Sequence, residues 1–549
     1  MKMIVKVNEK MSERIGMIQK KWRMPLKMSL GAVSIASMSV MLPNAAQAMQ
    51  WQAGQYTVTL QSTLGWTGGY RVSSLDSTYM NQPSNVNIDD GDRNFRHGVM
   101  ANRFQALEEL NIQDGDYGLR GSFLAWLDTV YLHNNENNSP YTVNTYSAGP
   151  RGFPSATVAN EGRRIEPLAL FLYGAEDFDA GQERLNWQLG RQTITWGETL
   201  FTFDGIAGLQ APVDYYEAAL LPNPQAQAVY LPTGAARAVY HFANGVSVDG
   251  YWKFEYMPSI LPGVGSYFSS ADIVGPGASQ IIQGYHGYPY PNAPRMADRR
   301  PTNGLDQFGI SLHDTIGNYT YSAYFVRGIP TTPGVITQLQ AYGSHIIAKN
   351  YAEYYAEPVN AYAVSFSTTV GQANVAGELS GRTSQPLSSS INVFGPLPGY
   401  GKVPYAMGDV INASLSTIWL TNPLPIFSNG ISISAETTFN KIVAVTENRD
   451  NLAAGTDEGA GTEIVFDPNW YPLPNLELET PLGWSESYIG HSRFDGGEQA
   501  GTGTVDIGLK FTYKSNLQFG VTYQRYYGPI NHQALEDRDF ITAYLNKTF

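Results

Sequence analysis

The chain of 549 residues contains no cysteine, which excludes disulfide bonds, thiolate metal sites and cysteine nucleophiles. Beyond residue 48 it also lacks any apolar run of the ~18 residues that a membrane-spanning helix requires. Charged residues are scarce, at 15%, whereas the chain holds 55 Gly, 35 Tyr and 10 Trp. This composition is typical of many strands and turns, with aromatic residues available for membrane interfaces. The aromatic content also argues against disorder.

The first 48 residues differ in character from the rest of the chain. Basic residues precede an apolar run from Met28 to Leu42, and the small-residue sequence Ala46-Gln47-Ala48 follows it. This pattern predicts a secretory signal peptide over residues 1–48, cleaved after Ala48, with a mature chain of residues 49–549. A membrane anchor is the alternative interpretation, but the apolar run is shorter than the ~18 residues that a spanning helix needs.

The expected mature chain is strongly acidic. Residues 1–48 carry eight of the 35 basic residues and two of the 48 acidic ones, so the remainder has a formal net charge of −19. Nucleic acid and anionic lipid headgroups would be repelled by the averaged field of such a chain. Neither is therefore predicted as a partner.

Residues 235–256 show a two-residue period on both sides of Asn244-Gly245, which is a favoured hairpin turn. The apolar residues after the turn are Val246, Val248, Trp252, Phe254 and Tyr256. Charged and polar residues alternate with them and fall on the opposite face. The apolar face would be the core of a soluble sandwich or the lipid-facing side of a membrane barrel, and the hairpin alone does not distinguish these folds.

The connections between predicted strands alternate between short and long, which favours the barrel. Outer-membrane barrels have short periplasmic turns and long extracellular loops, and an even strand number when both termini are periplasmic. We predict an all-β fold, a transmembrane antiparallel β-barrel of about 16 strands within a range of 14 to 18. The longest loops are expected at 257–304 and 446–500. The strands are expected near residues 55–66, 99–112, 117–131, 165–174, 184–196, 235–242, 246–256, 305–313, 318–327, 358–369, 373–382, 407–419, 429–445, 501–513, 516–527 and 538–549.

The last strand ends on an aromatic residue, Phe549, with Leu545 and Ile541 on the same face. Such endings resemble the targeting strand of bacterial outer-membrane barrels, which implies the barrel-assembly machinery and outer-membrane lipid as partners. Lys547 departs from the pattern, although its long side chain can reach water near the interface. The hairpin before the last strand, residues 505–523, alternates between apolar and polar residues, and an edge hairpin of a secreted β-sandwich is its alternative interpretation.

Four stretches resemble a known family. They are Asp89–Phe95 (DDGDRNF), Leu189–Glu198 (LGRQTITWGE), Val213–Pro222 and Phe254–Ser270. In these stretches the chain is similar to the domain-of-unknown-function 1302 family of Gram-negative outer-membrane proteins. The resemblance implies an outer-membrane location after signal cleavage. For some members it also implies an association with envelope exporters and a periplasmic carrier of hydrophobic molecules, and it supplies no site residues.

A strand runs into the loop 197–234 through several charged and aromatic residues, and a short helix is expected at 215–221. An inward fold of this loop would form a constriction that selects solutes by size and charge. An exposed extracellular loop is the alternative. The candidate residues for the constriction are Arg191, Trp196, Glu198 and Asp204.

A second set of channel-lining candidates comes from the alternation in the hairpin. Side chains opposite the apolar face would line a water-filled interior. The alternative is a cross-strand network of ion pairs without a role in selectivity. These candidates are Arg237, His241, Asp249, Lys253 and Glu255.

Asp89, Asp90 and Asp92 are a weak candidate for a calcium site, because clustered carboxylates around a glycine suit a hard cation. A turn with an acidic rim is the alternative, since the full EF-hand spacing is absent. The eight histidines are scattered, and neither H-E-x-x-H nor G-x-S-x-G occurs. We therefore predict no enzymatic activity, no cofactor and no other metal.

The combined prediction is an outer-membrane channel or transport barrel for small hydrophobic or amphipathic molecules. It would work with an envelope exporter or a periplasmic carrier. The alternative is a structural or surface-interaction barrel without transport activity. Stepwise conductance in a planar bilayer would distinguish the two.

Overall fold

A computed structural model describes residues 48–549 except 97, 140, 145–150, 203–204, 222–225, 284–289 and 495–497. The predicted signal peptide, apart from Ala48 itself, lies outside the described residues. Among the described residues, no helix combines the length and hydrophobicity needed to cross a membrane.

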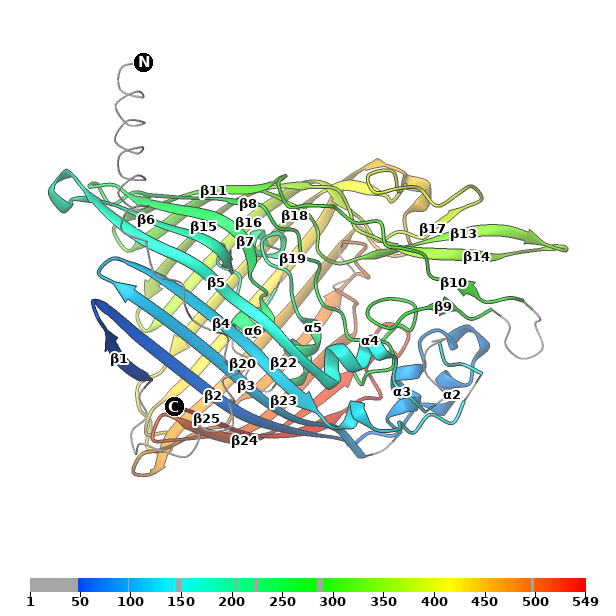
Figure 1. Ribbon diagram of the computed structural model, residues 1–549, viewed down its shortest axis with the longest axis horizontal. Coiled ribbons are helices and arrows are strands. Elements are labelled where there is room, and N and C mark those ends of the chain that lie inside the picture. The colour runs from blue at the N-terminus through cyan, green and yellow to red at the C-terminus, as the bar shows by residue number, and fades with distance from the viewer. Residues whose placement is uncertain are drawn as a thin grey trace, which may run out of the picture. The chain divides into compact units, whose positions relative to one another are not determined.

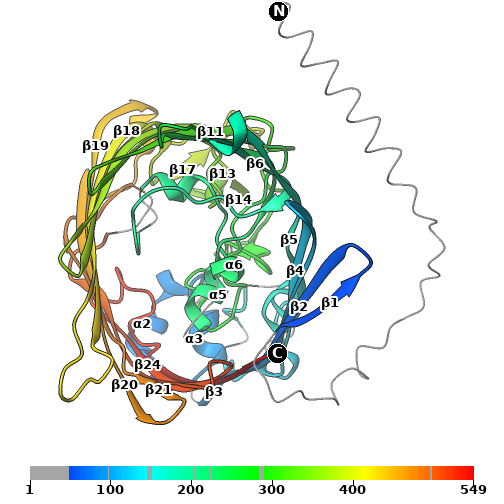
Figure 2. The same cartoon turned by 90° about the vertical axis from the view of Figure 1, so that its left-hand side faces the viewer.

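Within the described residues, eighteen antiparallel strand positions close into a barrel, which is seen end-on in Figure 2. The first and last of these strands join, with Thr63 opposite Thr548 and Arg71 opposite Phe540. The strands are β2 (Tyr56–Arg71), β3 (Gly98–Asp114), β4 (Tyr117–Asp128), β5 (Arg163–Phe178), β6 (Glu183–Gln192), β7 (Thr233–His241), β8 (Ser247–Lys253), β11 (Gln307–Ile316), β12 (Tyr319–Gly328), β15 (Val359–Val370), β16 (Ala373–Pro386), β18 (Met407–Leu420), β19 (Ile431–Glu447), β20 (Glu458–Leu473), β21 (Leu476–Glu479) with β22 (Leu482–Ile489), β23 (Thr502–Tyr513), β24 (Leu517–Tyr527) and β25 (Phe540–Thr548).

All sixteen predicted strands are present. The prediction of one long loop over residues 446–500 is wrong. This segment contains β20 and one interrupted strand, because β21 and β22 both pair with β20 on one side and with β23 on the other. The break falls at Thr480-Pro481, and proline cannot donate a ladder hydrogen bond. Pro468 lies within β20. These prolines hide the two-residue period.

The barrel is apolar outside and polar inside. On β8, Trp252 is exposed, whereas the neighbouring inward side chain of Lys253 is buried. On β16, Leu379 is exposed and Glu378 is buried. Hydrocarbon solvates such an outer face, and ladder closure satisfies the backbone within the bilayer. The predicted fold class, a transmembrane antiparallel β-barrel, is confirmed.

The strand connections differ between the two ends of the barrel. Hairpin turns such as 115–116 and 317–318 lie at one end, and loops such as 72–97, 129–162 and 254–306 lie at the other. The short helices in the connections are α2 (Ser77–Met80), α3 (Asp90–Asn94), α4 (Ser155–Thr157), α5 (Tyr215–Leu220), α6 (Ala226–Val229), η2 (Pro83–Asn85), η3 (Val130–Leu132), η4 (Val158–Gly162), η5 (Asp179–Gly181), η6 (Ile206–Leu209) and η7 (Arg449–Asn451).

Several strands lie outside the barrel wall. β13 (Gly334–Tyr342) and β14 (His345–Tyr354) form a hairpin that pairs with β17 (Ile391–Val393) and projects beyond the barrel in Figure 1. β9 (Gln280–Ile281) pairs with β10 (Ala293–Pro294). β1 (Met49–Ala53) folds back on the first residues of β2, pairing Met49 with Leu60 and Ala53 with Tyr56.

Candidate functional site: a loop that narrows the barrel interior

The connection from β6 to β7, residues 193–232, enters the barrel, and Figure 2 shows α5 and α6 inside the ring. Its local sequence explains part of this path. The Asp214 carboxylate accepts hydrogen bonds from the amides of Tyr216 and Glu217, which caps the N-terminus of α5. We name residues 193–232 the inner loop.

Two buried glutamates on the barrel wall hold the tip of the inner loop. Glu436 on β19 accepts hydrogen bonds from the amides of Leu200, Phe201 (3.2 Å) and Thr202 (3.1 Å). Glu378 on β16 accepts from the amides of Glu198 (3.2 Å) and Ile206 (2.8 Å). Charge-assisted bonds of this kind are about twice as strong as neutral ones.

Glycines let the loop backbone approach Glu378 closely. A Cβ atom on Gly197 would lie 2.5 Å from one Glu378 oxygen, and one on Gly205 would lie 2.6 Å from the other. Gly197 also has φ +110°, which disfavours any other residue. The sequence therefore provides both the acceptor on the wall and the space for the loop to reach it.

Trp196 fixes the start of the inner loop against β8. Its indole Nε1 donates to Asp249 (2.9 Å), and the Asp249 carboxylate also pairs with Arg237. Gln210 accepts from the Trp196 amide through its side chain and from the Lys253 ammonium through its backbone carbonyl. Four candidates from the sequence, Trp196, Arg237, Asp249 and Lys253, thus gather around one segment.

The remaining candidates are placed elsewhere. Arg191 lies 3.5 Å from Glu255, whose carboxylate accepts from the amide of Gly234. Glu198 is half-buried beside Glu378, and His241 is exposed at the end of β7. Asp204 lies outside the described residues.

The structure corrects the expectation that Asp249 and Lys253 face open water. Their exposed fractions are 4% and 3%, because the inner loop covers them. Alternation along β8 correctly identified these side chains as inward-facing. It could not show which distant segment packs on them.

A buried ion pair that no local sequence pattern predicts holds α5. Arg103 on β3 contacts Glu217 through two parallel hydrogen bonds of 2.5 and 2.8 Å, and both side chains are almost fully buried. The guanidinium also lies 4.4 Å from the ring centre of Trp126. Because 114 residues separate the partners, no local pattern connects them.

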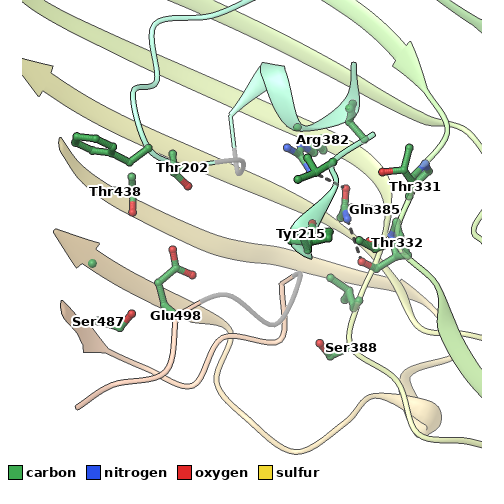
Figure 3. Close-up of a pocket in the computed structure, with 18 of the residues that line it drawn as sticks. Thr202, Tyr215, Thr331, Thr332, Arg382, Gln385, Ser388, Thr438, Ser487 and Glu498 are labelled. Atoms are coloured by element: carbon green, nitrogen blue, oxygen red, sulfur yellow. Dashed lines mark hydrogen bonds between the residues drawn. The ribbon is translucent and has the colours of Figure 1, made fainter. Parts of the chain in front are cut away.

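A cavity of about 810 Å³ remains between the inner loop and strands β19 to β23 (Figure 3). Its two sides are chemically unlike. Loop residues, including Leu209, Val213, Pro330 and Leu387, supply an apolar side. The charged residues that line the cavity are Glu436, Glu463, Glu486, Glu498 and Arg382.

Loops 72–97, 129–162 and 254–306 pack on one another at the long-loop end of the barrel, and we call them the capping loops. Phe95, Tyr131 and Tyr267 pack edge-to-face in an aromatic cluster that also contains Phe540 of β25. Asp92 binds Arg538 through hydrogen bonds of 2.7 and 2.8 Å. Burial alone would raise the pKa of Asp92, but Arg538 and Arg71 hold it below its usual value.

The three aspartates of the weak calcium candidate, Asp89, Asp90 and Asp92, do not lie in one cluster. Asp92 belongs to the Arg538 ion pair, whereas Asp89 and Asp90 lie beside Asp272 from another loop. Burial raises the pKa of Asp90 to about 8, and the nearby Asp89 carboxylate contributes to the shift.

Glu161 connects two of the capping loops and makes their docking sensitive to pH. It is fully buried, accepts a 2.6 Å hydrogen bond from the amide of Gly263, and has its pKa raised to about 8 by burial. The folded form therefore holds a proton that the unfolded form, with a pKa of 4.5, releases. Stability is lost as pH rises from about 4.5 to about 8 and is constant above that.

We expect limited proteolysis of loops 129–162 and 254–306 to accelerate several-fold in the wild type, relative to Glu161→Gln, between pH 5.5 and pH 8.5. The neutral amide has no proton to lose, so comparison with this variant at each pH also cancels the pH dependence of the protease. An unchanged ratio of cleavage rates would contradict the assignment.

A serine–histidine contact in the barrel wall gives no support for catalysis. His313 contacts Ser311 through one ring nitrogen (2.9 Å) and Ser322 through the other (2.8 Å). Both ring nitrogens are thus occupied by hydroxyls, and neither is left for the orienting carboxylate of a triad. The absence of enzymatic activity stays a prediction.

The chain is similar to several solved structures, among them an outer-membrane channel. The DcaP channel of Acinetobacter baumannii is 10% identical, over 92% of this chain and 100% of that one, with a TM-score of 0.38. OccAB3 of the same species is 10% identical over 90% and 99% of the two chains, with a TM-score of 0.42. OccK2 of Pseudomonas aeruginosa, solved in complex with glucuronate, is 9% identical over 90% and 97%, with a TM-score of 0.38.

No curated protein matches the chain. One family description matches residues 29–549, which is nearly the whole sequence. That span includes the four stretches quoted above, both strands hidden in residues 446–500 and the entire inner loop. The chain belongs to the family described as "Protein of unknown function (DUF1302)".

Proposed function

We propose that this protein is an outer-membrane channel whose interior is narrowed by the inner loop. We further propose that small amphipathic cations permeate it in preference to anions. The apolar outer face and polar interior support the location in a membrane. Barrels of 16 to 18 strands are too wide for wall side chains to fill, so they hold water unless a segment blocks them. The inner loop occupies part of that space and leaves the 810 Å³ cavity.

The single observation that carries the proposal is the charge on this cavity. Four glutamates and one arginine line it, and the Arg382 guanidinium is already bonded to the carbonyl of Gly205 (2.6 Å). The glutamates outnumber the arginine, and an excess of one sign of charge on low-dielectric walls concentrates counter-ions in a cleft. Cations are therefore favoured over anions of the same size.

The apolar side of the cavity refines the class of solute. Leu209, Val213, Pro330 and Leu387 would contact a hydrocarbon portion while the opposite glutamates contact a positive group. This arrangement supports amphipathic cargo and disfavours solutes that are hydrophobic throughout, because burying the glutamates against apolar atoms is costly.

The test removes charge without disturbing the inner loop. Glu463 and Glu486 line the cavity but are not among the loop's hydrogen-bond acceptors described above. We expect E463Q/E486Q to lower the cation-over-anion permeability ratio in planar bilayers by about three-fold at 0.1 M salt, and by less at 1 M, where the Debye length falls to about 3 Å.

Glu458→Gln is the matched control. Glu458 pairs with Lys441 at an exposed position and does not line the cavity. It removes one carboxylate charge outside the cavity, as each of the two test substitutions does inside it, and should leave the permeability ratio unchanged. Wild-type channels without cation preference would refute the charge argument.

A second candidate function is a surface-interaction barrel without transport. The projecting β13–β14 hairpin favours it, because Ile346 (62% exposed) and Tyr342 (44% exposed) present apolar side chains near its tip. A barrel that stays electrically silent in bilayers, with intact strand content, would support this function and contradict the first.

The partners remain predictions. The C-terminal strand supports recognition by the barrel-assembly machinery, and the family resemblance supports a periplasmic carrier or an envelope exporter. Photo-crosslinkers at the short turns 115–116 and 317–318 would test contact with a periplasmic carrier or an envelope exporter, since these turns face the periplasm in the proposed orientation.

A further inference from the structure

Three buried aspartates from two distant loops meet at the long-loop end of the barrel. Asp89 and Asp90 begin α3, and Asp272 comes from the loop 254–306. One carboxylate oxygen from each lies within 4.8 Å of the other two, and all three residues are at most 2% exposed. Figure 1 shows α3 near β9 and β10, where the long loops gather.

Two of these carboxylates accept hydrogen bonds from backbone N–H groups, which bring no net positive charge. Asp272 Oδ2 accepts from the amide of Asp90 (3.1 Å), and Asp90 Oδ2 accepts from the amide of Asn144 (2.9 Å). Asp89 is paired with Arg93. Among the described residues, neither Asp90 nor Asp272 has an ion pair within 4.0 Å.

Buried oxygens without hydrogen-bond partners are a separate indication that this cluster binds a ligand. Asp272 Oδ1 and Asn144 Oδ1 are both inaccessible to solvent and accept no hydrogen bond from any described residue. Asn144 is itself fully buried, and its backbone N–H donates a hydrogen bond to Asp90. Leaving such acceptors unsatisfied destabilises the folded protein, and a charged group more than a neutral one.

We propose that Asp89, Asp90 and Asp272 bind a calcium ion. Calcium takes six to eight oxygen ligands in irregular geometry, including carboxylates, amide carbonyls and water. The side-chain oxygen Oδ1 of Asn144 is a neutral candidate ligand, since it has no hydrogen-bond partner and the backbone N–H of the same residue bonds Asp90. The double positive charge offsets the two aspartates that lack a cation.

The proposed ion would join three loops at once. The aspartates come from loops 72–97 and 254–306, and Asn144 belongs to loop 129–162. Asn144 also bonds Asn87 (2.6 Å) and the carbonyl of Gln280 (3.1 Å), which places it between the other two loops. Calcium outside the cell would thereby fix the loops that cover the barrel.

Calcium binding to the full mature protein in detergent, after treatment with EDTA and dialysis, tests this directly. Titration calorimetry with CaCl₂ should give one saturable site per chain, and magnesium should bind at least ten-fold more weakly because it demands octahedral geometry. We expect Asp272→Asn to weaken calcium binding at least ten-fold.

Asp306→Asn is the matched control, because it removes an exposed carboxylate from the same loop, where it pairs with Arg327. It should bind calcium as the wild type does. A second readout does not depend on any variant: calcium should slow proteolysis of the three loops in the wild type several-fold.

Three results would overturn the proposal. The first is the absence of saturable calcium binding by the wild type, which would mean that the aspartates share protons instead. The second is equal binding of calcium and magnesium by the wild type. The third is calcium binding by Asp272→Asn equal to that of the wild type. None of these outcomes bears on cation selectivity in the cavity, so the two proposals can fail independently.

Discussion

Replacing residues 194–231 with a four-residue Gly/Ser turn should increase single-channel conductance roughly three-fold or more, since the interior of an 18-stranded barrel is wide once no segment enters it. The change is compatible with the wall because Gln192 and Thr233 are directly opposed in the β6–β7 ladder. A tight turn can therefore join them, and no strand pairing is lost.

The measurement is conductance in planar bilayers, made on samples whose strand content by circular dichroism equals that of the wild type. Replacing residues 340–347 with a two-residue Asn-Gly turn is the control, because it shortens the projecting hairpin outside the barrel wall, where Leu339 and Ala348 are directly opposed, and should leave conductance unaltered. If the loop replacement conducts no better than the wild type, the narrowest point lies elsewhere, and the capping loops become the next candidates.

Glu217→Gln should release α5 from the barrel wall. The substitution leaves the buried Arg103 guanidinium without a counter-charge, which typically costs about 3–5 kcal/mol. The barrel ladder is untouched, so we expect local opening of the inner loop rather than global unfolding. Hydrogen exchange of the α5 amides should accelerate by roughly two to three orders of magnitude, as a factor of ten corresponds to about 1.4 kcal/mol.

Glu109→Gln is the comparison for this experiment, because Glu109 pairs with Arg120 at the other end of β3. Arg120 is 48% exposed, and such surface pairs are worth about 0–1 kcal/mol. This variant should leave exchange at α5 unchanged. A double change of Arg103 to Met and Glu217 to Leu should recover part of the protection, since apolar replacements restore packing without a buried charge. Protection of α5 in Glu217→Gln equal to that in the wild type would show that other contacts hold the loop.

The barrel could be predicted from the sequence because alternation is local. Residues two apart in a strand point to the same face, and a short turn joins two strands that pair with each other. These rules predict sixteen of the strands without tertiary information. The two missed strands show the limit of this reasoning. Pro468 and Pro481 interrupt the pattern, while pairing on both sides keeps β20 and β22 in the sheet.

The candidate site was only partly predictable. Alternation identified Asp249 and Lys253 as inward-facing, but their burial depends on Trp196 and Gln210 of a loop whose path is set by distant acceptors. Arg103 with Glu217, and Asp90 with Asp272, are contacts between segments separated by more than a hundred residues. Such pairs carry no signal in a single sequence, because nothing local distinguishes a glutamate that meets an arginine from one that meets water.

The short strand β1 pairs with the part of β2 that extends beyond its neighbour β25. β25 covers β2 only from Thr63 onward, so the first residues of β2 overhang the C-terminus with their ladder groups unpaired on that side. β1 doubles back over Tyr56 to Leu60 and hydrogen-bonds this overhang. An unpaired strand edge is a template for a foreign strand. β1 therefore protects the seam where the first and last barrel strands meet from pairing with another polypeptide.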